Sequence, residues 1–240
     1  MKLRSILALI AILAAAAARA QTVDEIVARH LAARGGPQAL AAVRTLRMTG
    51  HAFAGPGREA IVRREIARPG RIRTEFVFQG MTGVYIWDGS AGSRVSPLDG
   101  GFEPEPLSED AAALSAEQAD LEGPLVNWRE KGHRVELVGN ASLPSGTAHE
   151  LRVTLQSGAV RRVWVDAQTG HIVKSSSTRK VRGHELEFET VYGDYRETAG
   201  VRFARSIEIG VGGRPQRMRI EVESVEVNPT LDDSRFRIPK

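Results

Sequence analysis

The sequence of 240 residues contains no cysteine. Disulfide bonds and thiolate metal sites are therefore excluded, and the fold must be stabilised by its core alone. A lipid-modified N-terminal cysteine is excluded for the same reason, so the chain is not itself a lipoprotein. The six histidines are scattered, and none forms H-E-x-x-H or another metal-ligand spacing. We therefore expect no metal and no cofactor.

Catalytic motifs are also missing. There is no P-loop and no dinucleotide fingerprint, and Gly89-Ser90-Ala91-Gly92 lacks the G-x-S-x-G pattern of a nucleophile elbow. Glu185, Glu187 and Glu189 alternate along the chain, which is typical of the solvent-facing stripe of a strand and not of an acid–base pair. The sequence therefore predicts that the protein is not an enzyme.

Outside the first twenty residues the chain has no marked excess of positive or negative charge. Residues 1–20 hold three basic residues and no acidic one, which leaves 30 basic against 29 acidic residues in 21–240. This balance gives no support for a nucleic-acid partner.

The first twenty residues have the pattern of a secretory signal peptide. Lys2 and Arg4 precede an apolar run from Ile6 to Ala18, and Ala18-Arg19-Ala20 is a small-x-small cleavage site. We expect cleavage between Ala20 and Gln21, which leaves 21–240 as a single exported domain. An uncleaved anchor is the alternative, although the apolar run is short for a membrane span.

Two segments have helical patterns. Thr22 and Glu25 form a capping box before an apolar stripe at helical spacing, and Gly35-Gly36 followed by Pro37 predicts a second helix, so that 22–44 is a helical pair. Residues 108–121 predict another helix with a weak apolar stripe, and a break at Ser115 is one alternative. This inserted helix is either a movable lid or a plain surface connection.

Between and after these segments the apolar period is two. Ile72, Phe76 and Phe78 alternate with charged residues, Asp88-Gly89 predicts a hairpin, and the Pro- and Gly-rich stretch 97–106 reads as a loop. A phase slip at Ser224 indicates a β-bulge. We expect about ten antiparallel strands, arranged as a barrel or sandwich.

Several of these turns and strands resemble one known family. Gly70-Arg71-Ile72-Arg73 after a proline, Asp88-Gly89, Ser96-Pro97-Leu98 and the ending Asp232 to Pro239 are similar to the LolA-like superfamily of periplasmic outer-membrane lipoprotein-sorting proteins. The resemblance implies a mainly β (α+β) fold: a curved, half-open antiparallel β-barrel around an apolar cavity, closed by helical lid segments. It implies a monomeric periplasmic carrier that takes the acyl chains of lipoproteins or lipids toward the outer membrane. An inner-membrane transporter and an outer-membrane acceptor would be its partners.

The resemblance also favours a cavity over a filled core, whereas the residues alone favour an ordinary core. With 22–44 and 108–121 as the cover, the residues expected to line the cavity are Leu46, Met48, Phe76, Phe78, Met81, Trp87, Leu186, Phe188 and Ile220. Arg205 falls on the apolar parity between Phe203 and Ile207, and Arg63 is similarly ambiguous. Each is either a head-group anchor at the cavity mouth or a side chain that reaches solvent at a strand end.

A second function remains open for the same fold. The chain could be a periplasmic sensor or interaction module that binds a protein partner through a sheet edge or the cavity. A core filled by side chains would favour this alternative.

Overall fold

The computed structural model describes residues 21–181 and 184–237, so the predicted signal peptide lies outside the described residues. The helices are α1 (Val23–Ala33), α2 (Pro37–Ala42) and α3 (Glu109–Gln118), with short 3-10 turns η1 (Pro97–Asp99) and η2 (Asp233–Phe236). The strands are β1 (Thr45–Phe53), β2 (Glu59–Ala67), β3 (Arg71–Phe78), β4 (Met81–Trp87), β5 (Gly92–Ser96), β6 (Gly101–Pro106), β7 (Arg134–Leu143), β8 (Gly146–Thr154), β9 (Val160–Asp166), β10 (Ile172–Val181), β11 (His184–Thr198), β12 (Val201–Val211) and β13 (Arg217–Val227).

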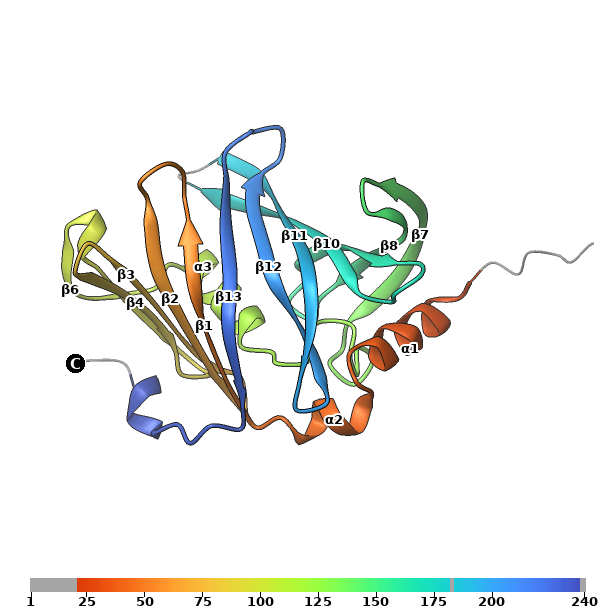
Figure 1. The fold of residues 1–240 in the computed structure, drawn as a ribbon, viewed down its shortest axis with the longest axis horizontal. Helices are drawn as coiled ribbons and strands as arrows, with labels where there is room; N and C mark the ends of the chain where they lie inside the picture. The colour runs from red at the N-terminus through yellow and green to blue at the C-terminus, as the bar shows by residue number, and fades with distance from the viewer. Residues whose placement is uncertain (1–20, 182–183, 238–240) are drawn as a thin grey trace, which may run out of the picture.

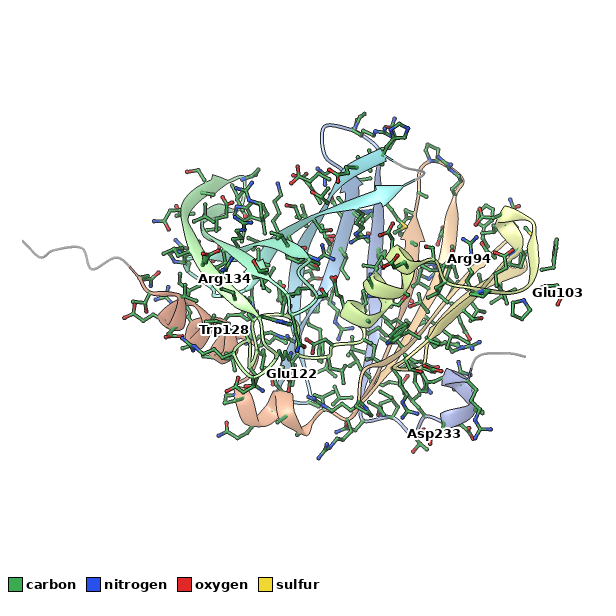
Figure 2. The ribbon with its side chains drawn as sticks, turned by 180° about the vertical axis from the view of Figure 1, so that it is seen from behind. Arg94, Glu103, Glu122, Trp128, Arg134 and Asp233 are labelled. Atoms are coloured by element: carbon green, nitrogen blue, oxygen red, sulfur yellow. The ribbon has the colours of Figure 1, made fainter. Side chains whose placement is uncertain are left out.

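All thirteen described strands form one antiparallel sheet. Their order is β6-β5-β4-β3-β2-β1-β13-β12-β11-β10-β9-β8-β7, so β1 pairs with β13 and joins an N-terminal half to a C-terminal half. β6 and β7 are the two edges and do not pair with each other. The sheet curves strongly around α3, which lies behind it in Figure 1 and in front of it in Figure 2. The predicted half-open antiparallel barrel is confirmed.

Two details differ from the sequence-based expectations. The sheet has thirteen strands where about ten were expected, and 97–106 is not a loop, because it contains η1 and the edge strand β6. Pro104 and Pro106 are tolerated there because an edge strand pairs on one side only, so a missing N–H costs no ladder bond. In addition, α3 continues through Ser115 without a break.

The expected bulge near Ser224 is present. The partner of Thr49 is Ser224, but the partner of Gly50 is Val222, so Glu223 is left over in the ladder. A Cβ atom on Gly50 would collide with the backbone carbonyl of Glu221. Glycine at this position therefore lets β13 approach β1 closely at the bulge.

The helices α1 and α2 cover part of the concave face. α1 begins with the predicted capping box, in which Thr22 and Glu25 satisfy each other's backbone N–H groups. Its buried residues Ile26 and Val27 belong to a core that includes Leu151, Val153 and other apolar side chains of β7–β9. A second core surrounds Leu40 of α2 and continues to β1–β3 and β12. Between these two cores the concave face is not filled.

Candidate functional site: a cavity under helix α3

A cavity of about 1390 Å³ lies between the concave face of the sheet and α3. This volume exceeds the roughly 300–1,000 Å³ of ordinary small-molecule sites. Its walls come from β1 in one half of the sheet and from β9–β12 in the other, and α1 and the segment that follows α3 contribute to its lower end. The cavity therefore occupies the gap between the two packed cores.

The roof of the cavity is α3. Ala113, Leu114 and Ala116 line the space beneath it, and no residue within α3, which is described in full, is buried. One ion pair ties the helix to the C-terminal half of the sheet. Arg161 of β9 donates from Nε and Nη2 to the two carboxylate oxygens of Glu117, at 2.8 and 2.6 Å. α3 is therefore held by this bidentate contact and by side chains that are only partly buried, and it also lies against β3 and β4.

The wall formed by β10 and β11 mixes apolar and hydroxyl side chains. Phe188 lines the cavity, and the guanidinium of Arg179 lies over its ring at 4.9 Å. Ser175 and Ser177 face the cavity from β10, and Ser175 lies 3.2 Å from the hydroxyl of Tyr192. This wall can therefore contact both an acyl chain and a polar group.

The lower end of the cavity is closed by a charged cluster in the segment after α3. Arg34, the residue that caps the end of α1, donates to the carbonyl of Glu122 at 2.6 Å, and Arg68 donates to the Glu122 carboxylate at 2.8 Å. Lys131 contacts Asp120 at 2.6 Å. Glu122 is labelled near the centre of Figure 2, below α3. Because these contacts join α1, the turn after β2 and the segment after α3, this end of the cavity is fixed.

His30 lies at this same end, on the inner side of α1. The residue is 2% exposed, and Nδ1 lies 3.0 Å from the carbonyl oxygen of Gly170. Burial, with the nearby charge of Arg34, lowers the pKa of His30 to about 4. The imidazole is therefore neutral at pH 7 and serves to seat α1.

The strand register places all nine predicted cavity residues on the concave face. Met48 and Phe188 line the cavity. Leu46 and Trp87 belong to the core beside α2, while Phe76 and Ile220 belong to a smaller core with Ala52 and Val62. Phe78 and Met81 face each other at the β3–β4 hairpin, and Leu186 lies opposite Arg179 near the far end of β10 and β11. A role of these nine residues in lipid binding stays a prediction.

The two predicted anchor residues are not among the residues that line the cavity. Arg63 lies on the outer face, where its side chain is 48% exposed and 3.6 Å from Glu75. Arg205 donates to the carbonyl of Glu223 at 3.3 Å and to Thr198 Oγ1 at 2.9 Å. A head-group role for either arginine also remains a prediction.

Arg64, the neighbour of Arg63, is the charged residue of β2 on the concave face. Sequence reasoning missed it, because Ile61, Val62 and Ile66 do not share one parity and leave the phase of β2 undecided. The register shows that Val62, Arg64 and Ile66 point inward. Since the side-chain period of a strand is two, an error of one residue exchanges the two faces. The sequence pattern that could have placed Arg64 on the inner face is its alternation with Val62 and Ile66.

Neither a metal site nor a membrane helix is present in the described part of the chain. No group of three or more His, Asp or Glu side chains there could hold a metal ion. No helix in the same residues is long and apolar enough to cross a membrane.

Comparison with known proteins finds this architecture among solved structures. No family model and no curated protein matches the sequence. Among solved structures, a LolA superfamily protein from Nitrosomonas europaea matches 91% of this chain and 98% of its own, with a TM-score of 0.58 and 15% identity. The chain has the fold of the LolA superfamily.

Two further structures with this LolA-like fold agree. A domain from Vibrio parahaemolyticus assigned to outer membrane lipoprotein sorting matches 90% of this chain and 97% of its own, with a TM-score of 0.56 and 10% identity. A DUF1329 family protein from Desulfovibrio piger matches the same shares of the two chains, with a TM-score of 0.59 and 10% identity. The resemblance noted in the sequence is thus confirmed at the level of the LolA-like fold.

Proposed function

We propose that this protein is a periplasmic carrier that binds the acyl chains of lipids or lipoproteins in the cavity beneath α3 and moves them toward the outer membrane. The observation that carries the proposal is an unfilled concave space of about 1390 Å³ in a fold of the LolA type. The N-terminal signal pattern supports export, and the absence of a catalytic motif from the sequence supports binding without chemistry.

The energetics explain why such a carrier needs a cover. Burying each CH₂ group contributes about 0.8 kcal/mol, so keeping a chain of about 16 carbons out of water is worth about 12 kcal/mol. A cavity that offers this much apolar surface must be shielded from water when it is empty. α3 supplies that shield without being part of either core.

Release of the cargo requires that the cover be displaced at a modest cost. The contact between Glu117 and Arg161, whose side chains are 25% and 15% exposed, is an ion pair that would have to break for α3 to move. The inner-membrane transporter and outer-membrane acceptor expected from the resemblance would bind the protein when α3 is displaced. The carrier is proposed to act as a monomer.

The test is native mass spectrometry of residues 21–240 purified from the periplasm, with extraction and identification of bound lipid. The test variant is Phe188→Glu, because Phe188 lines the cavity, and the matched control is Phe102→Glu, because Phe102 is 71% exposed on edge strand β6. We expect a bound acyl species in the parent protein and in Phe102→Glu, and its loss in Phe188→Glu.

The contrary result is a protein free of lipid that also fails to bind a fluorescent fatty acid. That result would transfer support to the alternative function, a sensor or interaction module that binds a protein partner. Equal lipid binding by both glutamate variants would show instead that lipid binds elsewhere than at Phe188.

A further inference from the structure

Arg64 stands in an apolar part of the concave face. Its neighbours on the same face of β2 are Val62 and Ile66, which are 5% and 6% exposed. Its cross-strand partners are Met48 of β1, which lines the cavity, and Thr74 of β3, which is 7% exposed. A guanidinium in such a place is costly unless an anionic or polar group accepts its hydrogen bonds.

The described residues provide no such acceptor. Arg64 makes no hydrogen bond and no ion pair with any of them, and its Nε is buried without a partner. Burial lowers the pKa of Arg64. Other arginines beside the cavity differ in this respect, since Arg161 is paired with Glu117 and Arg68 with Glu122.

The guanidinium of Arg64 faces the interior of the molecule. Its Nε is enclosed by protein, whereas other atoms of the side chain remain accessible to solvent, and Arg64 is not itself among the residues that line the cavity. The register places Arg64 on the concave face beside Met48, so this part of the side chain lies next to the cavity that Met48 lines. Tyr192 of β11, which lines the cavity, is the titratable group among the described residues that acts on the charge of Arg64. Tyr192 lines the cavity from the other half of the sheet than β2.

We infer that Arg64, assisted by the hydroxyl of Tyr192, binds the anionic oxygen group of an amphiphilic ligand whose acyl chain occupies the cavity. This inference rests on the proposed carrier function and narrows its ligand to chains that end in a carboxylate or a phosphate. The planar guanidinium presents paired N–H donors that match the oxygens of both groups. The ligand enters with its charged group pointing inward, toward β2, instead of leaving it at the cavity mouth.

The experiment compares three ligands with the same dodecyl chain: laurate, dodecyl phosphate and the uncharged dodecanol. Each displaces a neutral naphthylamine probe from the folded protein, residues 21–240, and from three variants. Arg64→Met removes the charge, and Tyr192→Phe removes the hydroxyl. Arg63→Met is the matched control, because Arg63 is adjacent in sequence but lies on the outer face. Arg64→Met is expected to fold, since it replaces an unpaired charge on an apolar part of the concave face with an apolar side chain.

We expect the parent protein and Arg63→Met to bind an anionic ligand at least roughly tenfold more tightly than dodecanol, as one charge-assisted contact provides. Arg64→Met should lose this preference and keep its affinity for dodecanol, and Tyr192→Phe should lose part of it. Tighter binding of dodecyl phosphate than of laurate would identify a phospholipid as the source, and the reverse order would identify a fatty acid.

Two results would overturn the inference, and they differ. Binding of all three ligands with equal affinity, or a preference for anions that survives in Arg64→Met, would exclude Arg64 as the anion site and leave the carrier function intact. Failure of every ligand and of the probe to bind would overturn the carrier function, and the assignment of Arg64 with it.

Discussion

α1 and α3 both lie against the concave face of one sheet, yet they are attached in different ways. α1 buries Ile26, Val27 and His30 and contributes to the core over β7–β9. α3 buries none of its own residues and is joined to β9 through Glu117 and Arg161. The two helices have similar lengths, 11 and 10 residues, so length does not explain the difference. The apolar stripe of α1 seats it in a core, whereas no residue between Glu109 and Gln118 belongs to one.

The largest expected difference between the helices comes from removing one apolar side chain from each. Ile26→Ala should lower the free energy of unfolding by about 2–5 kcal/mol, because Ile26 is 1% exposed and its loss leaves a void in the core. Leu114→Ala, its counterpart in α3, should lower it by about 1 kcal/mol or less, since Leu114 borders an empty cavity. Urea unfolding of both variants measures this. Equal losses would show that α3 is as firmly packed as α1.

The second difference concerns pH. His30 has a pKa of about 4 in the folded protein, against 6.5 for an ordinary histidine. Between these two pH values the unfolded chain binds a proton that the folded protein does not, so the free energy of unfolding falls as the pH falls from 6.5 to 4. The loss should be about 3 kcal/mol.

His30→Gln removes the titrating imidazole but keeps a side-chain N–H that can donate to the carbonyl of Gly170. The free energy of unfolding should therefore depend less on pH between 4 and 6.5. Chemical unfolding at several pH values checks it. A residual slope is expected, because burial also lowers the pKa values of His133, His149 and His171. If the variant and the parent protein show the same slope, the seat of α1 does not depend on a neutral His30.

The smallest effect on stability should accompany the largest effect on local motion. Glu117→Gln removes the ion pair with Arg161, and we expect the global free energy of unfolding to change by about 1 kcal/mol at most. Amide hydrogen exchange in 109–118 should become faster, while exchange in 23–33 should not change. The control is Glu105→Gln, which removes the ion pair with Arg94 between β5 and β6, away from α3. Unchanged exchange in 109–118 would mean that other contacts hold α3.

The strand parities were the most predictable part of this structure. Leu46 and Met48, and likewise Phe76 and Phe78, alternate cleanly with polar residues, which is sufficient to place them on one face. The bulge beside Ser224 could be predicted for the same reason, since a change of parity within one strand requires an extra residue.

What could not be predicted depended on long-range pairing. The phase of β2 is fixed by its partners Met48 and Thr74, and without them Arg63 and Arg64 cannot be assigned to a face. The contact between Glu117 and Arg161 joins residues far apart in the sequence, so no local pattern reveals it. The cavity itself is a property of three-dimensional packing: the same alternating residues would suit a filled core equally well.

In the proposed carrier, the unpaired edges β6 and β7 would affect which acyl chains fit. In a closed barrel, the number of strands and their stagger set the diameter, so the backbone alone determines the size of the interior. Here the two edges belong to opposite ends of the strand order, and no ladder bond between them fixes the curvature. The width of the cavity is then determined by side chains and by the position of α3. A longer acyl chain would then be accommodated by a small change in the bend of the sheet for each added carbon. It would not be excluded by a rigid wall.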